Sequence, residues 1–196
     1  MHTRKIVLAS TSPRRIQLLK QLGVKFECFD PNSSEDSIAT GPKQRVKENA
    51  EKKARYAMQQ YSEALIIAAD TIVYFEGKIL EKPRDVADAI RMVTQLSGQV
   101  HFVYTAIFIH DTISGRSRVE VEKTLVRIKN LTQEEIYSYV LTGESMDKAG
   151  AYAAQGLGGL LLEEINGCFY NVVGLPLSLL HKMLVDFDLD LLIDQK

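Results

Sequence analysis

Apolar runs typical of β-strands alternate along the chain with segments in which apolar residues recur at helical spacing. The runs that predict strands cover residues 6–8, 25–30, 65–75, 78–80, 101–110 and 119–128. The segments that predict helices begin at Ser12, at residue 42, at Asp85, at Thr132 and at Pro176. Since this order needs both hairpins and crossovers, we expect an α/β fold with a mixed sheet and flanking helices. The 196 residues suffice for a single domain over 1–196, folded into two lobes around a cleft.

Two dipeptides predict tight β-hairpin turns. Glu76-Gly77 separates residues 65–75 from 78–80, and Asn166-Gly167 lies between apolar runs near 160–165 and 168–173. Asn-Gly is the strongest short-range hairpin signal, since both of its residues accept positive φ. We therefore expect a hairpin at each place, with a strand on both sides of Asn166-Gly167.

Bulk composition excludes several classes of protein. Hydrophobic residues make up 45% of the chain and charged residues 25%, which is ordinary for a globular protein. The formal net charge of −1 argues against polymeric nucleic acid or an anionic membrane as a partner. No apolar stretch has membrane-spanning length, and residues 1–20 lack the pattern of a signal peptide. Any positively charged site must therefore be local.

Cysteine and histidine usage is typical of a cytoplasmic protein without a zinc site. Cys28 and Cys168 lie far apart in sequence and form no metal-type pair, so we expect reduced, buried thiols. The four histidines are scattered, which supports neither a zinc site nor a histidine triad. We therefore expect a cytoplasmic location.

The first helix begins in an electrostatically unusual way. Ser12 is the expected N-cap and Pro13 the first helical residue, after a short apolar strand. Arg14 and Arg15 then occupy the first turn, where the positive end of the helix dipole disfavours cations. The arrangement makes sense if backbone N–H groups and two guanidinium groups hold an anion there. Phosphate is the expected anion.

Asp70 interrupts the most apolar run of the chain. A bare carboxylate inside residues 65–75 is costly unless it is paired, hydrogen-bonded or bound to metal. Buried acids cluster at functional sites, which makes Asp70 a candidate. The alternative is that Asp70 caps a strand end or a turn, with Thr71 beside it.

Two lysines are candidates to neutralise a bound phosphate. In the helix over residues 42–61, Lys53 falls on the same face as Val46, Ala50 and Ala57. Its ammonium either points into a site or reaches solvent along its apolar stem. Lys82, which precedes a proline after the first hairpin, is either a site residue or a solvated loop lysine.

An acidic loop and a glycine-bearing loop complete the candidates. Glu35 and Asp36 are either surface charge or carboxylate ligands of a magnesium ion that travels with a nucleotide. Residues 146–159 form either a flexible surface loop or a binding loop, in which Gln155 offers a donor and an acceptor to a base edge. The chain contains no G-x-x-x-x-G-K-[ST] loop. The anion site, the buried aspartate and the lysines together indicate phosphoryl chemistry with a divalent ion.

The motifs resemble those of the Maf family of nucleotide pyrophosphatases over nearly the whole chain. The residues that carry the resemblance are Ser10-Thr11-Ser12-Pro13-Arg14-Arg15, Ala69-Asp70-Thr71, Leu80-Glu81-Lys82-Pro83, Leu96-Ser97-Gly98, Asp147-Lys148-Ala149-Gly150-Ala151-Tyr152, Gln155-Gly156 and Val173-Gly174-Leu175-Pro176. The resemblance implies a highly twisted mixed sheet similar to that of the inosine-triphosphate pyrophosphatases. It also implies hydrolysis of nucleoside triphosphates to monophosphate and pyrophosphate with Mg²⁺ or Mn²⁺, in a homodimer.

The resemblance also implies roles for single residues. Asp70 matches the catalytic acid or base, and Arg14, Thr71 and Gln155 match the positions that distinguish the subgroup acting on dTTP and UTP. A sister subgroup acting on 7-methyl-GTP has glutamate at the position of Gln155. The remaining expected site residues are Lys53 and Lys82 for catalysis, Ser10, Ser12, Arg15 and Lys148 for substrate binding, and Asp70 with Glu35 for metal.

The sequence is compatible with three different functions. The first is a dTTP and UTP pyrophosphatase that clears normal or modified nucleotides. The second is a 7-methyl-GTP pyrophosphatase. The third is a non-catalytic nucleotide-binding regulator of septum formation, since the family is associated with arrest of cell division.

The acidic loop departs from the family pattern. The family often has two adjacent carboxylates there, and Ser34 occupies the position of the first, so Glu35 and Asp36 are the acidic residues of this loop.

Overall fold

The structure is a computed structural model that describes residues 4–32 and 37–193. Seven strands form one mixed sheet in the order β2-β1-β3-β5-β6-β7, with β4 paired to β3. Strand β1 pairs in parallel with β2 and β3, whereas β3–β4 and β6–β7 are antiparallel. The strands are β1 (Lys5–Ala9), β2 (Glu27–Phe29), β3 (Ala64–Phe75), β4 (Lys78–Leu80), β5 (Val100–Asp111), β6 (Ser117–Ile128) and β7 (Leu162–Asn166). The expected α/β fold with a mixed sheet is confirmed.

Helices flank the sheet, and several begin at the expected caps. They are α1 (Pro13–Gln21), α2 (Pro42–Met58), α3 (Val86–Leu96), α4 (Gln133–Leu141), α5 (Phe169–Val173) and α6 (Leu177–Val185), with 3-10 helices η1 (Ala149–Ala151) and η2 (Gly156–Leu161). The Asp85 carboxylate accepts the amide of Asp88 at 2.8 Å and caps α3. Thr132 and Glu135 form the predicted capping box of α4.

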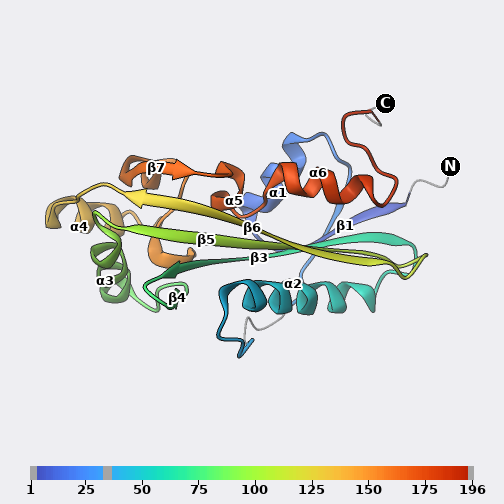
Figure 1. Cartoon of the computed structure of the whole chain (residues 1–196), viewed down its shortest axis with the longest axis horizontal. Coiled ribbons are helices and arrows are strands. Elements are labelled where there is room, and N and C mark those ends of the chain that lie inside the picture. The colour runs from blue at the N-terminus through green and yellow to red at the C-terminus, as the bar shows by residue number, and fades with distance from the viewer. Residues whose placement is uncertain (1–3, 33–36, 194–196) are drawn as a thin grey trace. The chain divides into compact units, whose positions relative to one another are not determined.

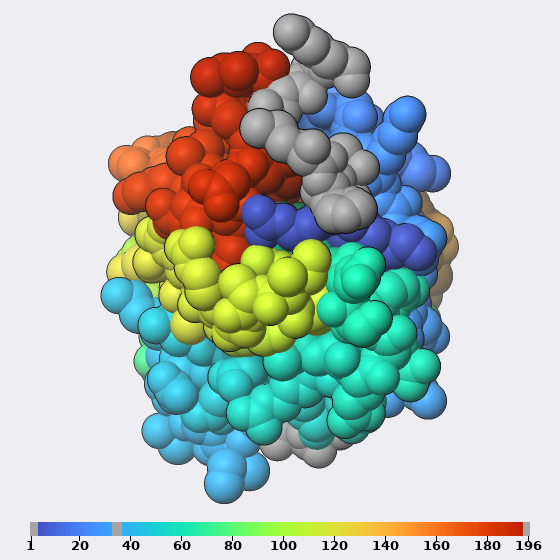
Figure 2. Space-filling view, turned by 90° about the vertical axis from the view of Figure 1, so that its right-hand side faces the viewer, coloured from blue at the N-terminus to red at the C-terminus, as the bar shows by residue number. Residues whose placement is uncertain are grey.

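The chain divides into two compact units. The first comprises Met1–Asp70, Thr105–Glu122 and Gly174–Lys196. In it, α1 and α6 lie on one face of the sheet and α2 lies on the other (Figure 1). The yellow-green end of the β5–β6 hairpin lies between the red C-terminal segment and the cyan residues of α2 (Figure 2). The buried core of this unit includes Val7, Leu8, Leu18, Leu19, Ile66, Ile67, Leu180 and Leu184.

The second unit comprises Thr71–Tyr104 and Lys123–Val173. Its core packs α3 and α4 with parts of β3, β5 and β6. The buried members include Val73, Ala89, Val93, Val103, Val126 and Ile136. Strands β3, β5 and β6 each contribute residues to both units. No helix within the described ranges is long and apolar enough to span a bilayer.

One of the two predicted hairpins is present and the other is wrong. Glu76 and Gly77 take φ values of 46° and 80° and join β3 to β4. After Asn166-Gly167, however, the chain enters helix α5 in place of a strand. The Asn171 side chain holds this helix by donating to the Val103 carbonyl at 3.1 Å and to the Thr124 hydroxyl at 2.9 Å. These tertiary hydrogen bonds override the local turn preference.

The prediction that both cysteines are buried is also wrong. Cys28 is exposed on the short strand β2, and Cys168 is half-buried just before α5. Strand β2 forms an edge of the sheet, so one side of the strand lies against water.

Candidate functional site

Helix α2 carries a lysine on its buried face. Val46, Ala50, Ala54 and Ala57 lie on this face and are fully buried. Lys53 shares the face and is only 6% exposed, as the helical spacing predicts. Its ammonium does not reach solvent along the stem, because Nζ lies 2.6 Å from the Asp70 carboxylate. The predicted alternative of a solvated Lys53 is therefore excluded.

Asp70 lies in the middle of β3 and is 2% exposed. The alternative that it caps a strand end is therefore wrong. One carboxylate oxygen accepts Lys53 Nζ, and the other accepts the side-chain amide of Asn49 at 3.0 Å. Both partners come from α2, one helical turn apart. Taking a carboxylate out of water costs several kcal/mol unless it is paired in this way, so the three side chains form one unit.

Asn49 is a member of this cluster that sequence reasoning missed. Its carbonyl oxygen accepts the backbone amide of Ser37 at 3.3 Å while its NH₂ group donates to Asp70. This pair of contacts fixes the orientation of the amide. The available signal was the spacing, because Asn49 stands three residues after Val46 on the apolar face of α2. We call Asn49, Lys53 and Asp70 the α2–β3 cluster.

The start of α1 differs in part from the prediction. Ser12 occupies the N-cap position, but within the described residues its side chain makes no capping hydrogen bond. Ser10 instead accepts the amide of Ser12 at 3.2 Å. Arg15 is buried; its Nε donates to the Gly174 carbonyl at 2.8 Å, and it approaches the Ser10 hydroxyl at 3.5 Å. Arg15 thus joins the start of α1 to the segment before α6, while Arg14 is half-buried.

In the second unit, the loop between α4 and β7 carries Lys148 and Gln155. Lys148 Nζ donates to the Glu144 carbonyl at 2.7 Å and to the Asp147 carboxylate at 2.6 Å. The amide of Gly150 donates to the Glu81 carbonyl at 3.1 Å, which places the residue before Lys82 against this loop. Lys82 is exposed, whereas Gln155 is half-buried. Thr71, half-buried in β3, also belongs to this unit.

Gly150 makes the approach of this loop possible. Its φ is 69°, and a Cβ there would lie 3.1 Å from the side chain of Val73. A larger residue would therefore be strained in its backbone and crowded against β3. The short 3-10 helices η1 and η2 within the segment, together with its hydrogen bonds, argue against a flexible loop.

A buried histidine supports the same loop. His101 on β5 is 1% exposed, and its Nε2 lies 2.7 Å from the hydroxyl of Tyr152. Among the described residues, its Nδ1 has no hydrogen-bond partner. Burial lowers the pKa of His101 to about 4. The sequence contains no signal for this contact, because only the fold brings His101 to Tyr152.

This pKa predicts an acid-sensitive fold. The folded-state pKa lies below the ordinary value of 6.5, so stability from neutral His101 is present above pH 6.5 and is lost as pH falls toward 4. The loss amounts to about 3 kcal/mol. We expect the free energy of unfolding, measured by urea denaturation, to fall less between pH 7 and pH 4 in the double variant His101→Phe/Tyr152→Phe than in the wild type. Equal pH slopes would contradict the assignment.

The described residues provide limited carboxylate ligands for a metal ion. No group of three or more His, Cys, Asp or Glu side chains gathers among them. Asp70 nevertheless suits a magnesium ion that comes with a substrate, because such ions use one or two protein carboxylates together with phosphate oxygens. Each Asp70 oxygen accepts one hydrogen bond from α2 and has two lone pairs. Glu35 and Asp36, the other expected candidates, lie outside the described residues.

Comparison with known proteins gives consistent matches. The family model of the Maf-like proteins matches residues 5–187. A "dTTP/UTP pyrophosphatase" of Dictyoglomus turgidum is 44% identical over 96% of this chain and 99% of its own length. A protein of the same name from Thermoanaerobacter sp. (strain X514) is 47% identical over 96% of this chain and all of its own. One from Clostridium perfringens is 41% identical, with the same coverage.

The fold has a solved counterpart at low sequence identity. The Staphylococcus aureus Ham1 protein superposes with a TM-score of 0.55 and 16% identity. The match covers 94% of this chain and 100% of that one. This likeness supports the architecture of the sheet and its helices.

Proposed function

The chain belongs to the Maf family, and we propose that it hydrolyses nucleoside triphosphates, dTTP and UTP foremost, to the monophosphate and pyrophosphate. The observation that carries the proposal is the buried α2–β3 cluster. Its aspartate stands at the position that the family resemblance marks as the catalytic acid or base, and its lysine lies 2.6 Å from that carboxylate. The names of relatives at 41–47% identity support the choice of pyrimidine nucleotides.

Asp70 is the proposed acid–base group. Its carboxylate orients a water molecule toward the α-phosphorus and takes a proton as the water attacks, and pyrophosphate leaves. Lys53 and Asn49 hold the carboxylate in one orientation through contacts of 2.6 and 3.0 Å. Positioning of this kind is a main source of rate in phosphoryl transfer.

A divalent ion, Mg²⁺ or Mn²⁺, belongs to this proposal. Asp70 would hold it, with Glu35 as the second candidate ligand. When bound, the ion would supply positive charge that offsets the charge of the phosphate groups. Cationic side chains of the protein also offset the negative charge of a triphosphate. The candidates for this role are Arg14, Arg15, Lys53 and Lys82.

The start of α1 is the proposed anchor for phosphate oxygens. A helix N-terminus offers backbone N–H groups and the positive end of the dipole. Ser10, Ser12 and Arg14 line this start. Arg15 is assigned a supporting part, because its Nε is used by the Gly174 carbonyl. This contact fixes the guanidinium group beside the helix start, where Arg15 stays a candidate for phosphate binding.

Base selection is assigned to Gln155 with Thr71 and Arg14, as the resemblance implies. An amide side chain both donates and accepts, which matches the imide edge shared by thymine and uracil. The homodimer rests on the resemblance, whereas the cytoplasmic location rests on the cysteine usage of the chain. Both belong to the same proposal.

A nucleotide panel tests the proposed function. Pyrophosphate release is measured with Mg²⁺ from dTTP, UTP, 5-methyl-UTP, pseudo-UTP, CTP and 7-methyl-GTP. We expect the highest kcat/KM among the thymine- and uracil-type nucleotides. Preferred turnover of 7-methyl-GTP would assign the chain to the sister activity. Binding without release from any nucleotide would support a regulator and overturn the enzyme.

Gln155→Glu is expected to shift this preference. The substitution replaces an NH₂ donor with a second acceptor, so an acceptor on the pyrimidine edge loses its partner. Because the site recognises the base by hydrogen bonds, we expect the loss of this donor to lower kcat/KM for UTP by about a hundredfold. The check is the ratio of kcat/KM for UTP to that for 7-methyl-GTP. An unchanged ratio would place base reading elsewhere.

A further inference from the structure

The Glu144 carboxylate in the second unit accepts hydrogen bonds from two backbone amides. The Oε1 atom of Glu144 accepts the amide of Gly158 at 2.8 Å, and its Oε2 atom accepts the amide of Leu157 at 3.1 Å. Both amides belong to the first turn of η2, which begins directly after Gln155. Hydrogen bonds to an ionised acceptor are about twice as strong as neutral ones. Glu144 therefore fixes the chain on the C-terminal side of Gln155.

Tyr139 links the Glu144 carboxylate to the backbone on the N-terminal side of Gln155. Its hydroxyl lies 3.4 Å from Glu144 Oε1, to which it donates, and it accepts the amide of Ala153 at 3.1 Å. Burial and the Glu144 carboxylate raise the pKa of Tyr139 above its usual range, so the hydroxyl keeps the proton that it donates. The amides two residues before and two and three residues after Gln155 are thus tied to a single carboxylate.

The backbone next to Gln155 is shaped to admit this carboxylate. Gly156 has a φ of +66°, and a Cβ there would lie 2.5 Å from Glu144 Oε2. Only glycine adopts this conformation without strain and leaves room for the carboxylate. The main chain of Glu144 also serves the loop, because its carbonyl accepts Lys148 Nζ at 2.7 Å.

We propose that Glu144 is a positioning residue for base selection, which fixes Gln155 by holding the backbone on both sides of it. The inference rests on the proposed function, in which Gln155 reads the base. The proposed role of Glu144 includes no contact with the substrate. Its removal therefore acts through the placement of the Gln155 amide and changes discrimination between bases more than it changes turnover of all nucleotides.

Glu144→Gln is the first test. The glutamine keeps the size of the side chain, but it offers one oxygen and turns an NH₂ group toward an amide that needs an acceptor. We expect the ratio of kcat/KM for UTP to that for CTP to fall roughly tenfold, because misplacement of a contact group by a fraction of an ångström weakens recognition. Glu134→Gln, an exposed change of the same type on α4, is the matched control and leaves the ratio unchanged.

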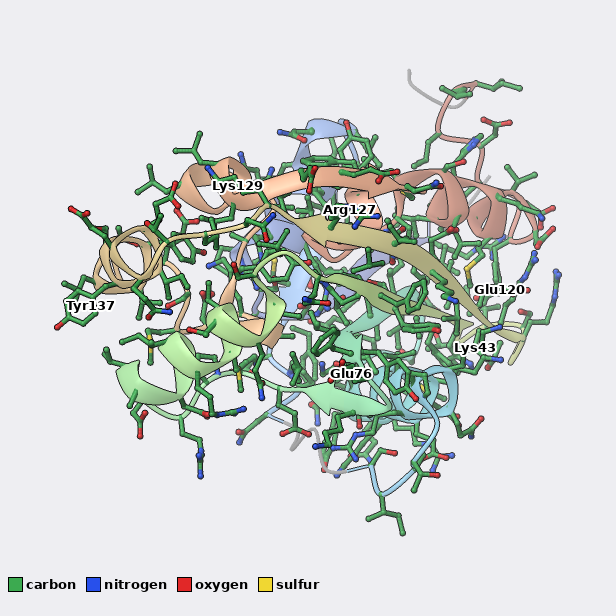
Figure 3. The ribbon with its side chains drawn as sticks, turned by 60° about the vertical axis from the view of Figure 1, so that its left-hand side comes forward. Lys43, Glu76, Glu120, Arg127, Lys129 and Tyr137 are labelled. Atoms are coloured by element: carbon green, nitrogen blue, oxygen red, sulfur yellow. The ribbon has the colours of Figure 1, made fainter. Side chains whose placement is uncertain are left out.

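Tyr139→Phe is the second test. It tests the same positioning role if the Glu144→Gln variant does not fold. It removes the hydroxyl that accepts the Ala153 amide. Its control is Tyr137→Phe, since Tyr137 projects from the outer side of α4 and is exposed (Figure 3). We expect a lower UTP-to-CTP ratio for Tyr139→Phe and the wild-type ratio for Tyr137→Phe.

Hydrogen exchange separates this inference from the proposed function, because it needs no nucleotide. We expect the amides of Leu157 and Gly158 to exchange faster in Glu144→Gln than in Glu134→Gln. Wild-type rates for these amides, or an unchanged UTP-to-CTP ratio in both test variants, would overturn the positioning role. A wild-type protein that releases no pyrophosphate would overturn the proposed function, and the role in base selection with it.

Discussion

Asp70→Asn is expected to lower kcat for pyrophosphate release from UTP about a thousandfold, because general acid–base groups contribute on this scale. The asparagine has nearly the same shape as the aspartate, and its carbonyl oxygen can still accept Lys53 Nζ. It has no negative charge to take a proton from water or to hold a divalent ion. The measurement is steady-state pyrophosphate release with Mg²⁺, at a temperature at which circular dichroism shows the variant folded.

A folded control distinguishes this loss from a general defect. Asp111→Asn removes a buried carboxylate that Arg4, Ile113 and Ser114 contact at the β5–β6 hairpin of the same unit. This variant is expected to lose stability and keep kcat. Turnover of Asp70→Asn within tenfold of the wild type would remove Asp70 from the catalytic role.

Lys53→Met is expected to have the largest effect on stability. It leaves the buried Asp70 carboxylate with the hydrogen bond from Asn49 but without its neighbouring positive charge. Removal of one member of a buried ion pair costs about 3–5 kcal/mol, because the remaining charge stays out of water without compensation. Urea denaturation measures this loss. The control is Lys43→Met on the exposed side of α2 (Figure 3), for which we expect a change within about 0.5 kcal/mol.

The double variant Lys53→Met/Asp70→Asn separates structure from function in the α2–β3 cluster. Neither side chain is charged in this variant, so the free energy of unfolding is expected to recover by about 2 kcal/mol relative to Lys53→Met. Activity is expected to stay at the level of Asp70→Asn. Recovery of turnover together with stability would mean that the pair serves only the fold.

Much of the fold follows from the sequence because local and global preferences agree. The capping box at Thr132 and Glu135 and the cap at Asp85 each set the start of a helix as expected. The hairpin at Glu76-Gly77 also follows from its turn residues. Asn166-Gly167 shows the limit of such reasoning. There the buried side chain of Asn171 finds partners on β5 and β6, which a local pattern does not contain.

In the candidate site, too, local patterns predict the burial of single residues but not their tertiary partners. Helical spacing places Lys53 on the buried face of α2, and the apolar run around Asp70 implies that this carboxylate needs a partner. That the two are partners, with Asn49 beside them, depends on how α2 packs on the sheet. Arg15 shows the same limit, because its place in the first turn of α1 does not reveal that its Nε donates to the Gly174 carbonyl, 159 residues away in sequence.

The most direct test of the central claim is the position of the oxygen that water donates. UTP is hydrolysed by the wild-type protein with Mg²⁺ in ¹⁸O-labelled water, and both products are analysed by mass spectrometry. Attack at the α-phosphorus predicts one labelled oxygen in UMP and unlabelled pyrophosphate in equal amount. Label in pyrophosphate, or release of single phosphate with UDP, would contradict the proposed reaction.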